Sequence, residues 1–101
     1  MNTQEVTFVR IYLTEGEGKL EGLLQGLYNE HKVQGFTVFR AISGFGKSGK
    51  MHYSSLLDIS LDLPVAIEFF DEPVRVASIL EQLAKDIEPG HIVSWRATLM
   101  V

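Results

Sequence analysis

The chain has 101 residues, of which 46% are hydrophobic, and its formal net charge is -4. This length predicts a single domain spanning residues 1–101. The absence of cysteine excludes disulfides, thiolate metal sites and cysteine nucleophiles. The mildly acidic balance argues against nucleic-acid binding, and no apolar run approaches the roughly 20 residues that span a bilayer. No signal-peptide pattern is visible in residues 1–5. We therefore expect a cytoplasmic protein with no nucleic-acid partner and no membrane insertion.

Four segments predict β-strands, because hydrophobic residues alternate along them or form a continuous run: residues 6–13, 36–43, 63–70 and 91–101. Two helical patterns lie between these strands, so the element order is β-α-β-β-α-β. This order predicts an α+β, ferredoxin-like fold, in which a four-stranded antiparallel sheet has two helices on one face. In the usual strand order of this fold, the first strand lies between the third and the fourth.

The first helix is predicted over residues 19–34, where leucines recur at helical spacing. Gly22 and Gly26 weaken this helix or allow close packing, and Gly35 is expected to end it in the left-handed region. The second helix is predicted from Pro73 onward, with Asp71 as its cap. Its inward-facing residues are expected to be Val76, Ala77, Leu80, Leu83, Ala84 and Ile87.

The sheet face away from the helices is predicted to be too apolar to remain in water. Strand alternation assigns to it Phe8, Arg10, Tyr12, Glu68, Phe70, Ile92, Arg96 and Met100. Exposed apolar patches of this kind usually mark an interface, so we predict an oligomer that buries this face. Arg10, Glu68 and Arg96 lie in the middle of their strands and are expected to form a charged cluster inside it. The alternative is a monomer with a solvated, half-polar face.

A glycine-rich, basic segment follows the second strand. Gly44, Gly46 and Gly49 allow positive φ angles and the close approach of another group. Lys47 and Lys50 add two positive charges. A turn of this kind can hold an anion, because unpaired backbone N–H groups can point at it. The alternative is a flexible hairpin tip with solvated lysines.

This segment resembles the nitrogen-regulatory PII proteins, which have Gly-Met-Thr-Val and then Gly-Phe-Gly-Arg-Gln-Lys-Gly. The chain has Gly35-Phe36-Thr37-Val38 and then Gly44-Phe45-Gly46-Lys47-Ser48-Gly49. The whole sequence is similar to a bacterial and archaeal PII-like family known as domain of unknown function one-ninety. The residues that carry this second resemblance are Arg10-Ile11-Tyr12, Gly44-Phe45-Gly46, His52 and Leu63-Pro64-Val65.

The resemblance implies a homotrimer whose sheets face inward and whose inter-subunit clefts bind a small anionic metabolite, such as an adenine nucleotide. The implied ligand-binding residues are Thr37, Gly44, Phe45, Gly46, Lys47, Gly90 and His91. The loop over residues 47–63 is implied to contact an unidentified protein partner through Lys50, His52 and Tyr53.

Two departures from the PII pattern bear on the ligand. One extra residue separates Thr37 from the glycine turn, and the Gly-Asp-Gly-Lys turn that contacts phosphate in PII proteins is reduced to Gly90-His91. A triphosphate therefore loses several expected cationic partners. A less charged nucleotide, another anion and no ligand at all stay open.

No acid-base pair, nucleophile motif or metal-ligand spacing is found in the sequence. His31, His52 and His91 lie on different predicted elements. We therefore predict no metal site, no catalytic residues, no cofactor beyond an anionic effector, and no enzyme activity. The leading hypothesis is a PII-like regulator whose ligand orders the loop, which then engages or releases a partner. The alternatives are a ligand-free interaction trimer and a small enzyme with its site on the open sheet face.

Overall fold

The computed structural model describes residues 1–45, 52–53 and 63–101. Its main sheet has four antiparallel strands, β1 (Thr3–Thr14), β2 (Gly35–Arg40), β5 (Pro64–Asp71) and β6 (Ile92–Met100). A second sheet pairs two short strands, β3 (Ser43–Gly44) and β4 (His52–Tyr53). The helical elements are η1 (Glu15–Glu17), α1 (Leu20–Gln25), the π-helix η2 (Gly26–Glu30) and α2 (Pro73–Leu83).

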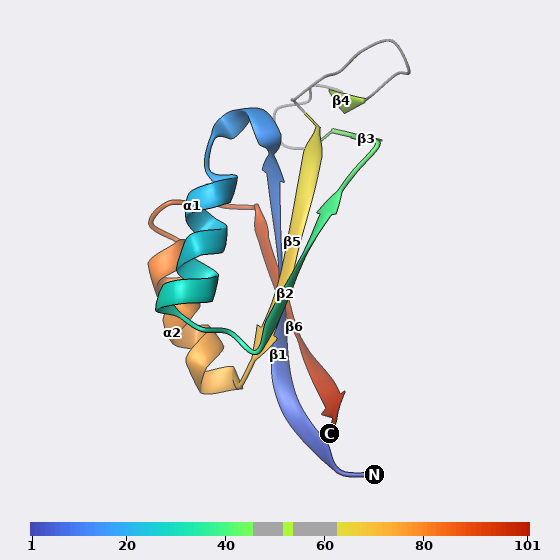
Figure 1. Ribbon diagram of the computed structural model, residues 1–101, viewed down its shortest axis with the longest axis vertical. Coiled ribbons are helices and arrows are strands. Elements are labelled where there is room, and N and C mark those ends of the chain that lie inside the picture. The colour runs from blue at the N-terminus through green and yellow to red at the C-terminus, as the bar shows by residue number, and fades with distance from the viewer. Residues whose placement is uncertain (46–51, 54–62) are drawn as a thin grey trace.

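The strands of the main sheet lie in the order β2-β5-β1-β6, with β1 between β5 and β6 as expected. Both helices cover the same face of this sheet, and the opposite face has no helix against it in the described part of the chain (Figure 1). The predicted α+β, ferredoxin-like arrangement is therefore confirmed. The small β3–β4 sheet was not expected, because Ser43 was predicted to end the second strand and Gly44 to begin the glycine-rich segment.

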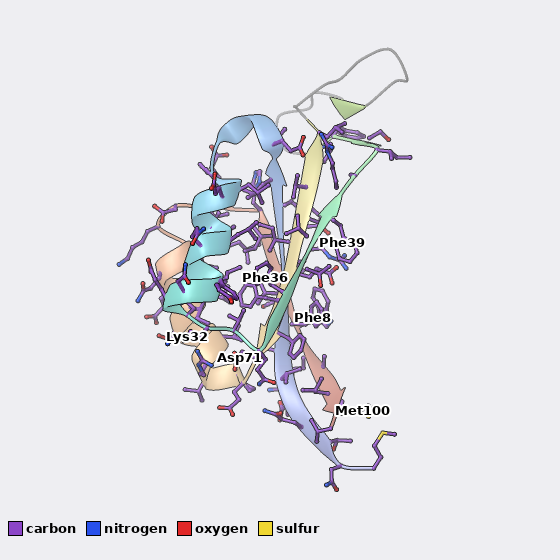
Figure 2. The ribbon with its side chains drawn as sticks, viewed as in Figure 1. Phe8, Lys32, Phe36, Phe39, Asp71 and Met100 are labelled. Carbon is purple, nitrogen blue, oxygen red and sulfur yellow. The ribbon has the colours of Figure 1, made fainter. Side chains whose placement is uncertain are left out.

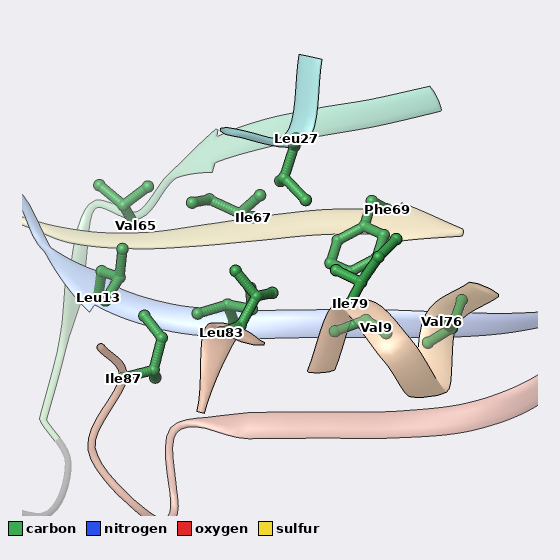
Figure 3. Close-up of a cluster of buried hydrophobic side chains, with 11 residues drawn as sticks. Val9, Leu13, Leu27, Val65, Ile67, Phe69, Val76, Ile79, Leu83 and Ile87 are labelled. Atoms are coloured by element: carbon green, nitrogen blue, oxygen red, sulfur yellow. The ribbon is translucent and has the colours of Figure 1, made fainter. Parts of the chain in front are cut away.

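The hydrophobic core lies between the sheet and the two helices (Figure 3). The central strands supply one side of it, because alternate residues of β1 and β5 point toward the helices. Residues that pack there are Val9, Ile11, Leu13, Val65, Ile67 and Phe69, with Leu27, Val76, Ile79, Leu83 and Ile87 from the helical layer. Ile79 was missed by the sequence pattern, and the predicted Ala77 and Ala84 are exposed.

The first helix is shorter and less regular than predicted. It changes from α to π geometry at Gly26 and ends at Glu30. Gly35 does not end it, because Gly35 is already part of β2 and the positive φ, of 50°, belongs to Lys32. A Cβ atom added at Gly22 or Gly26 would meet nothing within 4 Å. Of the two alternatives for these glycines, close packing is therefore wrong.

Buried Asp71 joins the end of the first helical segment to the start of α2, as its position between them in Figure 2 indicates. Its carboxylate accepts hydrogen bonds from the backbone N–H of Gln34 at 3.0 Å and of Glu72 at 2.8 Å. It also pairs with Arg75 at 3.1 Å, and Arg75 donates a hydrogen bond to the carbonyl of His31. Asp71 is therefore not the N-cap residue, which is Glu72.

Replacing this carboxylate by a methyl group should destabilise the fold. Asp71 is 1% exposed, so Asp71→Ala leaves two backbone donors without a partner, each worth about 1–3 kcal/mol. We expect the free energy of unfolding in urea to fall by about 3 kcal/mol at matched protein concentration. Asp86→Ala, at an exposed position after α2, is the control and should change it by less than about 0.5 kcal/mol. Equal effects of the two variants would contradict this role of Asp71.

Candidate functional site

The sheet face away from the helices, called the open face below, is organised in rows that cross all four strands. Residues paired across antiparallel strands point to the same side of a sheet. One row therefore consists of Gly35, Phe70, Phe8 and Trp95, and the next consists of Thr37, Glu68, Arg10 and Val93. Figure 2 shows Phe8 and Phe39 on this side of the sheet, whereas Phe36 points toward the helices.

The first row is a continuous aromatic stack. The Phe8 ring stacks on Phe70 with ring centroids 5.9 Å apart, and on Trp95 with centroids 5.0 Å apart. The Phe70 ring also lies beside Gly35, where an added Cβ atom would be 3.6 Å from it. These rings are not fully covered within one chain, since Trp95 remains 39% exposed.

The second row holds an ion pair in the middle of the apolar face. Arg10 donates from Nε and Nη2 to Oε1 of Glu68, at 2.9 and 2.6 Å. Its Nη1 donates to the hydroxyl of Tyr12 at 3.4 Å, and the guanidinium lies 5.4 Å from the centre of the Trp95 ring. The hydrogen bonds with Tyr12 and Glu68 raise the pKa of Arg10, so its positive charge is retained and its nitrogens are occupied.

The assignment of the last strand to the two faces was wrong by one residue. Arg96 pairs with Thr7, so it points to the helix side of the sheet and approaches Glu5 at 3.9 Å. Ile92 packs against the core. Met100 pairs with Thr3, which lies on the same face of β1 as Thr7, so Met100 also points away from the open face. The expected Arg10–Glu68 contact is confirmed, but Arg96 is not its third member.

Val93 and Trp95 take these places on the open face, and sequence reasoning missed both. They lie opposite Arg10 and Phe8 in the pairing of β1 with β6. The pattern of β6 could not assign them, because apolar residues occur on both of its faces.

The first half of the implied ligand site lies along β2 and beyond its end. Thr37 is exposed on the open face, opposite Glu68. Gly44 pairs with His52 and lies so close to Pro64 that an added Cβ atom would be 3.2 Å from it. Phe45 is exposed.

The remaining residues expected in this half are described only in part. Gly46, Lys47 and Lys50 lie outside the described residues, and for His52 and Tyr53 only the backbone pairing of β4 is described.

Arg40, at the end of β2, forms a bidentate ion pair with Glu15 that the sequence did not reveal. Its Nε lies 2.8 Å from Oε1 of Glu15, and its Nη2 donates to Oε2 at 3.1 Å. Both Arg10 and Arg40 are therefore already paired with carboxylates of the same chain.

The second half of the implied site is the turn that precedes β6. Gly90 has a φ of 89°, which turns the chain into β6. The Nδ1 atom of His91 lies 3.0 Å from the backbone oxygen of Tyr12, and its Nε2 atom lies 3.9 Å from a carboxylate oxygen of Glu88. The backbone of His91 also accepts a hydrogen bond from the N–H of Tyr12 at 2.9 Å.

The two halves lie at opposite edges of the sheet. β2 and β6 are the outer strands, so Thr37 and His91 are separated by three strand spacings, roughly 14 Å. A single chain does not bring them together.

Among residues 1–45, 52–53 and 63–101, no group of three histidine or acidic side chains could hold a metal ion. None of the described helices is both long and apolar enough to cross a membrane.

The fold is that of the PII-like proteins. A putative PII-like signalling protein from Thermus thermophilus superimposes with a TM-score of 0.68 at 14% identity, covering 100% of this chain and 93% of that one. A PII-like protein called CPII, from Thiomonas intermedia, was solved bound to ADP and bicarbonate. It superimposes with a TM-score of 0.67 at 21% identity, covering 99% of this chain and 91% of that one.

The chain belongs to the DUF190 family, described as "Uncharacterized ACR, COG1993", whose model matches residues 6–99. The resemblance drawn from the sequence is therefore confirmed. A UPF0166 protein of Aquifex aeolicus is 32% identical in an alignment 88 residues long, which covers 82% of this chain and 83% of that protein. A second match to a UPF0166 protein of the same organism is 31% identical over 74 residues, covering 73% of this chain and 75% of that protein.

Two glycine-to-alanine substitutions should have opposite effects on stability. Gly90→Ala forces a side chain into a positive φ and should lower the free energy of unfolding by about 1–2 kcal/mol. Gly22→Ala lies inside α1 with open space around the added atom. It should raise that energy by about 0.5–1 kcal/mol. Urea titration of both variants measures the difference, and a loss of stability at both positions would contradict the geometry of α1.

Proposed function

We propose that this protein is a PII-like regulator that forms a homotrimer and binds a small anionic metabolite in the clefts between its copies. The segment over residues 47–63 contacts a protein partner in a ligand-dependent way. Two observations support the proposal: the implied ligand residues lie at opposite edges of the sheet, and the open face exposes aromatic side chains. Assembly of copies through that face covers the exposed rings and can bring unlike edges together.

The open face is suited to burial because its central charges are already neutralised within one chain. Removing an isolated charge from water costs several kcal/mol, whereas a paired and hydrogen-bonded charge costs much less. Glu68 satisfies Arg10 from the adjacent strand, and Tyr12 and Trp95 contact the same guanidinium. The apolar rings around this pair then supply the favourable burial.

The anionic ligand is supported by the glycine turn with Lys47 and by the structural neighbours. CPII, which shares the fold, was solved with ADP and bicarbonate, and also with ADP, AMP and bicarbonate. Adenine nucleotides and bicarbonate are therefore the first ligands to test. We propose a regulatory role rather than catalysis, since the described parts of the site bring together hydrogen-bonding groups but no nucleophile with a base.

A charge placed on the open face should prevent assembly. Phe39 is 51% exposed on this face, and Phe39→Asp would bury a carboxylate without a partner at a cost of several kcal/mol. Native mass spectrometry should show a trimer for the wild type and a monomer for Phe39→Asp. Tyr28→Asp is the control, since Tyr28 is 70% exposed on η2, and should stay trimeric. A trimeric Phe39→Asp, or a monomeric wild type, would argue against the proposed assembly.

Removing the expected ligand contacts should weaken binding without affecting assembly. Isothermal titration with ADP, AMP and bicarbonate is expected to show that Lys47→Ala binds about tenfold more weakly or worse, because a hydrogen bond to a charged group is lost. Thr37→Val removes one hydroxyl at nearly constant volume and should have a smaller effect in the same direction. Lys85→Ala, exposed beyond α2, is the charge-matched control. A wild-type trimer that binds none of these ligands would favour the ligand-free interaction trimer.

A further inference from the structure

The outer edge of β6 presents a regular row of unpaired backbone groups. The N–H of Tyr12 donates to the carbonyl of His91 at 2.9 Å, and the N–H of Val101 donates to the carbonyl of Asn2 at the same distance. Hydrogen-bonded pairs alternate along an antiparallel ladder, and the register of β6 with β1 is continuous. Every second residue from His91 to Val101 therefore faces β1. The residues between them have N–H and C=O groups that point away from β1, and they are Ile92, Ser94, Arg96, Thr98 and Met100. No described residue pairs with this edge, since β6 is the last strand of the sheet.

The opposite edge of the sheet, along β2, has the same character. The N–H of Ala41 donates to the carbonyl of Pro64 at 2.9 Å, and the register of β2 with β5 is continuous. The same alternation points the backbone groups of Phe36, Val38 and Arg40 away from β5. Among residues 1–45, 52–53 and 63–101, no strand pairs with this outer edge.

Neither edge has the features that normally keep an edge strand from pairing. Such strands are usually short, bulged, or carry proline or lysine. The segments Gly35–Arg40 and Ile92–Met100 contain no proline and no lysine, and their registers contain no bulge. Within the four strands of the main sheet, all of which are described, exposed large hydrophobic side chains concentrate on these two edge strands. They are Val38 and Phe39 on β2, and Val93, Trp95 and Met100 on β6, with Tyr12 on β1 in addition.

The strand directions allow the two unlike edges to pair with each other between copies. Every neighbouring pair in the sheet is antiparallel, so β2 and β6 run in opposite directions. Two copies in the same orientation can therefore place β6 of one beside β2 of the next as a further antiparallel pair. The helices of both copies then stay on one side of the extended sheet, and the open faces stay on the other.

Pairing of two like edges is less favourable. Arg96 is the middle residue of β6, so two β6 strands paired along their full length would place Arg96 directly opposite its own copy, and like charges in that position are destabilising. Such a pair would also leave both open faces in water. A contact between unlike edges, repeated around an axis, closes into a ring and turns the open faces toward that axis.

We propose that the copies are joined by backbone hydrogen bonds between the outer edge of β6 and the outer edge of β2 of the next copy. This inference rests on the proposed function, because it takes the partner of each edge to be a second copy of the chain in the same assembly. The outward N–H and C=O groups of β6 pair with those of Phe36, Val38 and Arg40. The exposed side chains of the two edge strands then cover one another across the junction.

Amide hydrogen exchange, measured residue by residue with NMR on the assembled wild type, tests this pairing. The outward amides of Ser94, Arg96 and Thr98 should exchange within about tenfold of the rates of their inward neighbours Trp95 and Ala97, because both sets are hydrogen-bonded. The outward amide of Val38 on β2 should be protected in the same way. The inward amides are the internal control, since the ladder with β1 protects them in a single chain.

A proline substitution tests the same hydrogen bonds independently. Ser94→Pro removes an N–H that has no partner within the chain, and proline is tolerated on an edge strand that stays unpaired. Native mass spectrometry should show that Ser94→Pro is a monomer at a concentration at which the wild type is a trimer. Ser94→Thr keeps the N–H and is the matched control, which should stay trimeric. Circular dichroism checks that both variants are folded, and the exchange pattern of the wild type decides the question if Ser94→Pro is not.

The outcomes separate this inference from the proposed function. A trimer whose outward amides exchange freely while the inward ones are protected overturns the inference alone, because the copies then meet through their faces without pairing of the edges. A folded Ser94→Pro that stays trimeric does the same. A dimer with protection on β6 and not on β2 indicates pairing of like edges, and overturns both the inference and the proposed trimer. A monomeric wild type also overturns both.

Discussion

The pairing of β1 with both of its neighbours is the constraint on which the rest of the structure depends. β1 is hydrogen-bonded to β5 on one side and to β6 on the other, so its register sets which residues of both strands share a face. Val9 and Ile11 then join the core, and Phe8 and Arg10 join the open face. A shift of one residue in either pairing would exchange the two faces of a strand, and would put the aromatic stack into the core and the core residues into water.

The same register makes the open face chemically balanced. Phe8 is flanked by aromatic rings on both neighbouring strands, and Arg10 has a carboxylate on β5 and a ring on β6 within reach. The members of the aromatic row contact one another, and the members of the charged row pair with one another, within a single chain. A surface of this kind can associate with another copy and still leave no buried charge in need of a partner from outside.

Sequence reasoning was most successful where one physical signal decided the structure. The alternation in β1 and β5 identified the core face, and the element order identified the fold. Sequence reasoning failed where the hydrophobic pattern allowed two different assignments of a strand's faces. Both faces of β6 carry apolar residues, so only the hydrogen-bonded register could place Trp95 and Arg96.

Local helix geometry and contacts between distant residues could not be predicted from the sequence pattern either. The leucine spacing of the first helix gave no sign of the π-helical segment after Gln25. Asp71 has the local sequence of a helix cap, but its partners come from Gln34 and Arg75 as well as from the residue that follows it. The contact between the His91 ring and the backbone oxygen of Tyr12 joins two residues that are 79 positions apart in the chain.

The position of β2 and β6 at opposite edges of the sheet has a thermodynamic consequence. A ligand that needs both edges has no complete site on an isolated chain, so its binding is linked by mass action to association of the chains. Its apparent affinity then falls as the protein is diluted below the concentration at which copies associate, and the ligand in turn holds the assembly together. The concentration of the chain then sets how many complete sites exist for such a ligand.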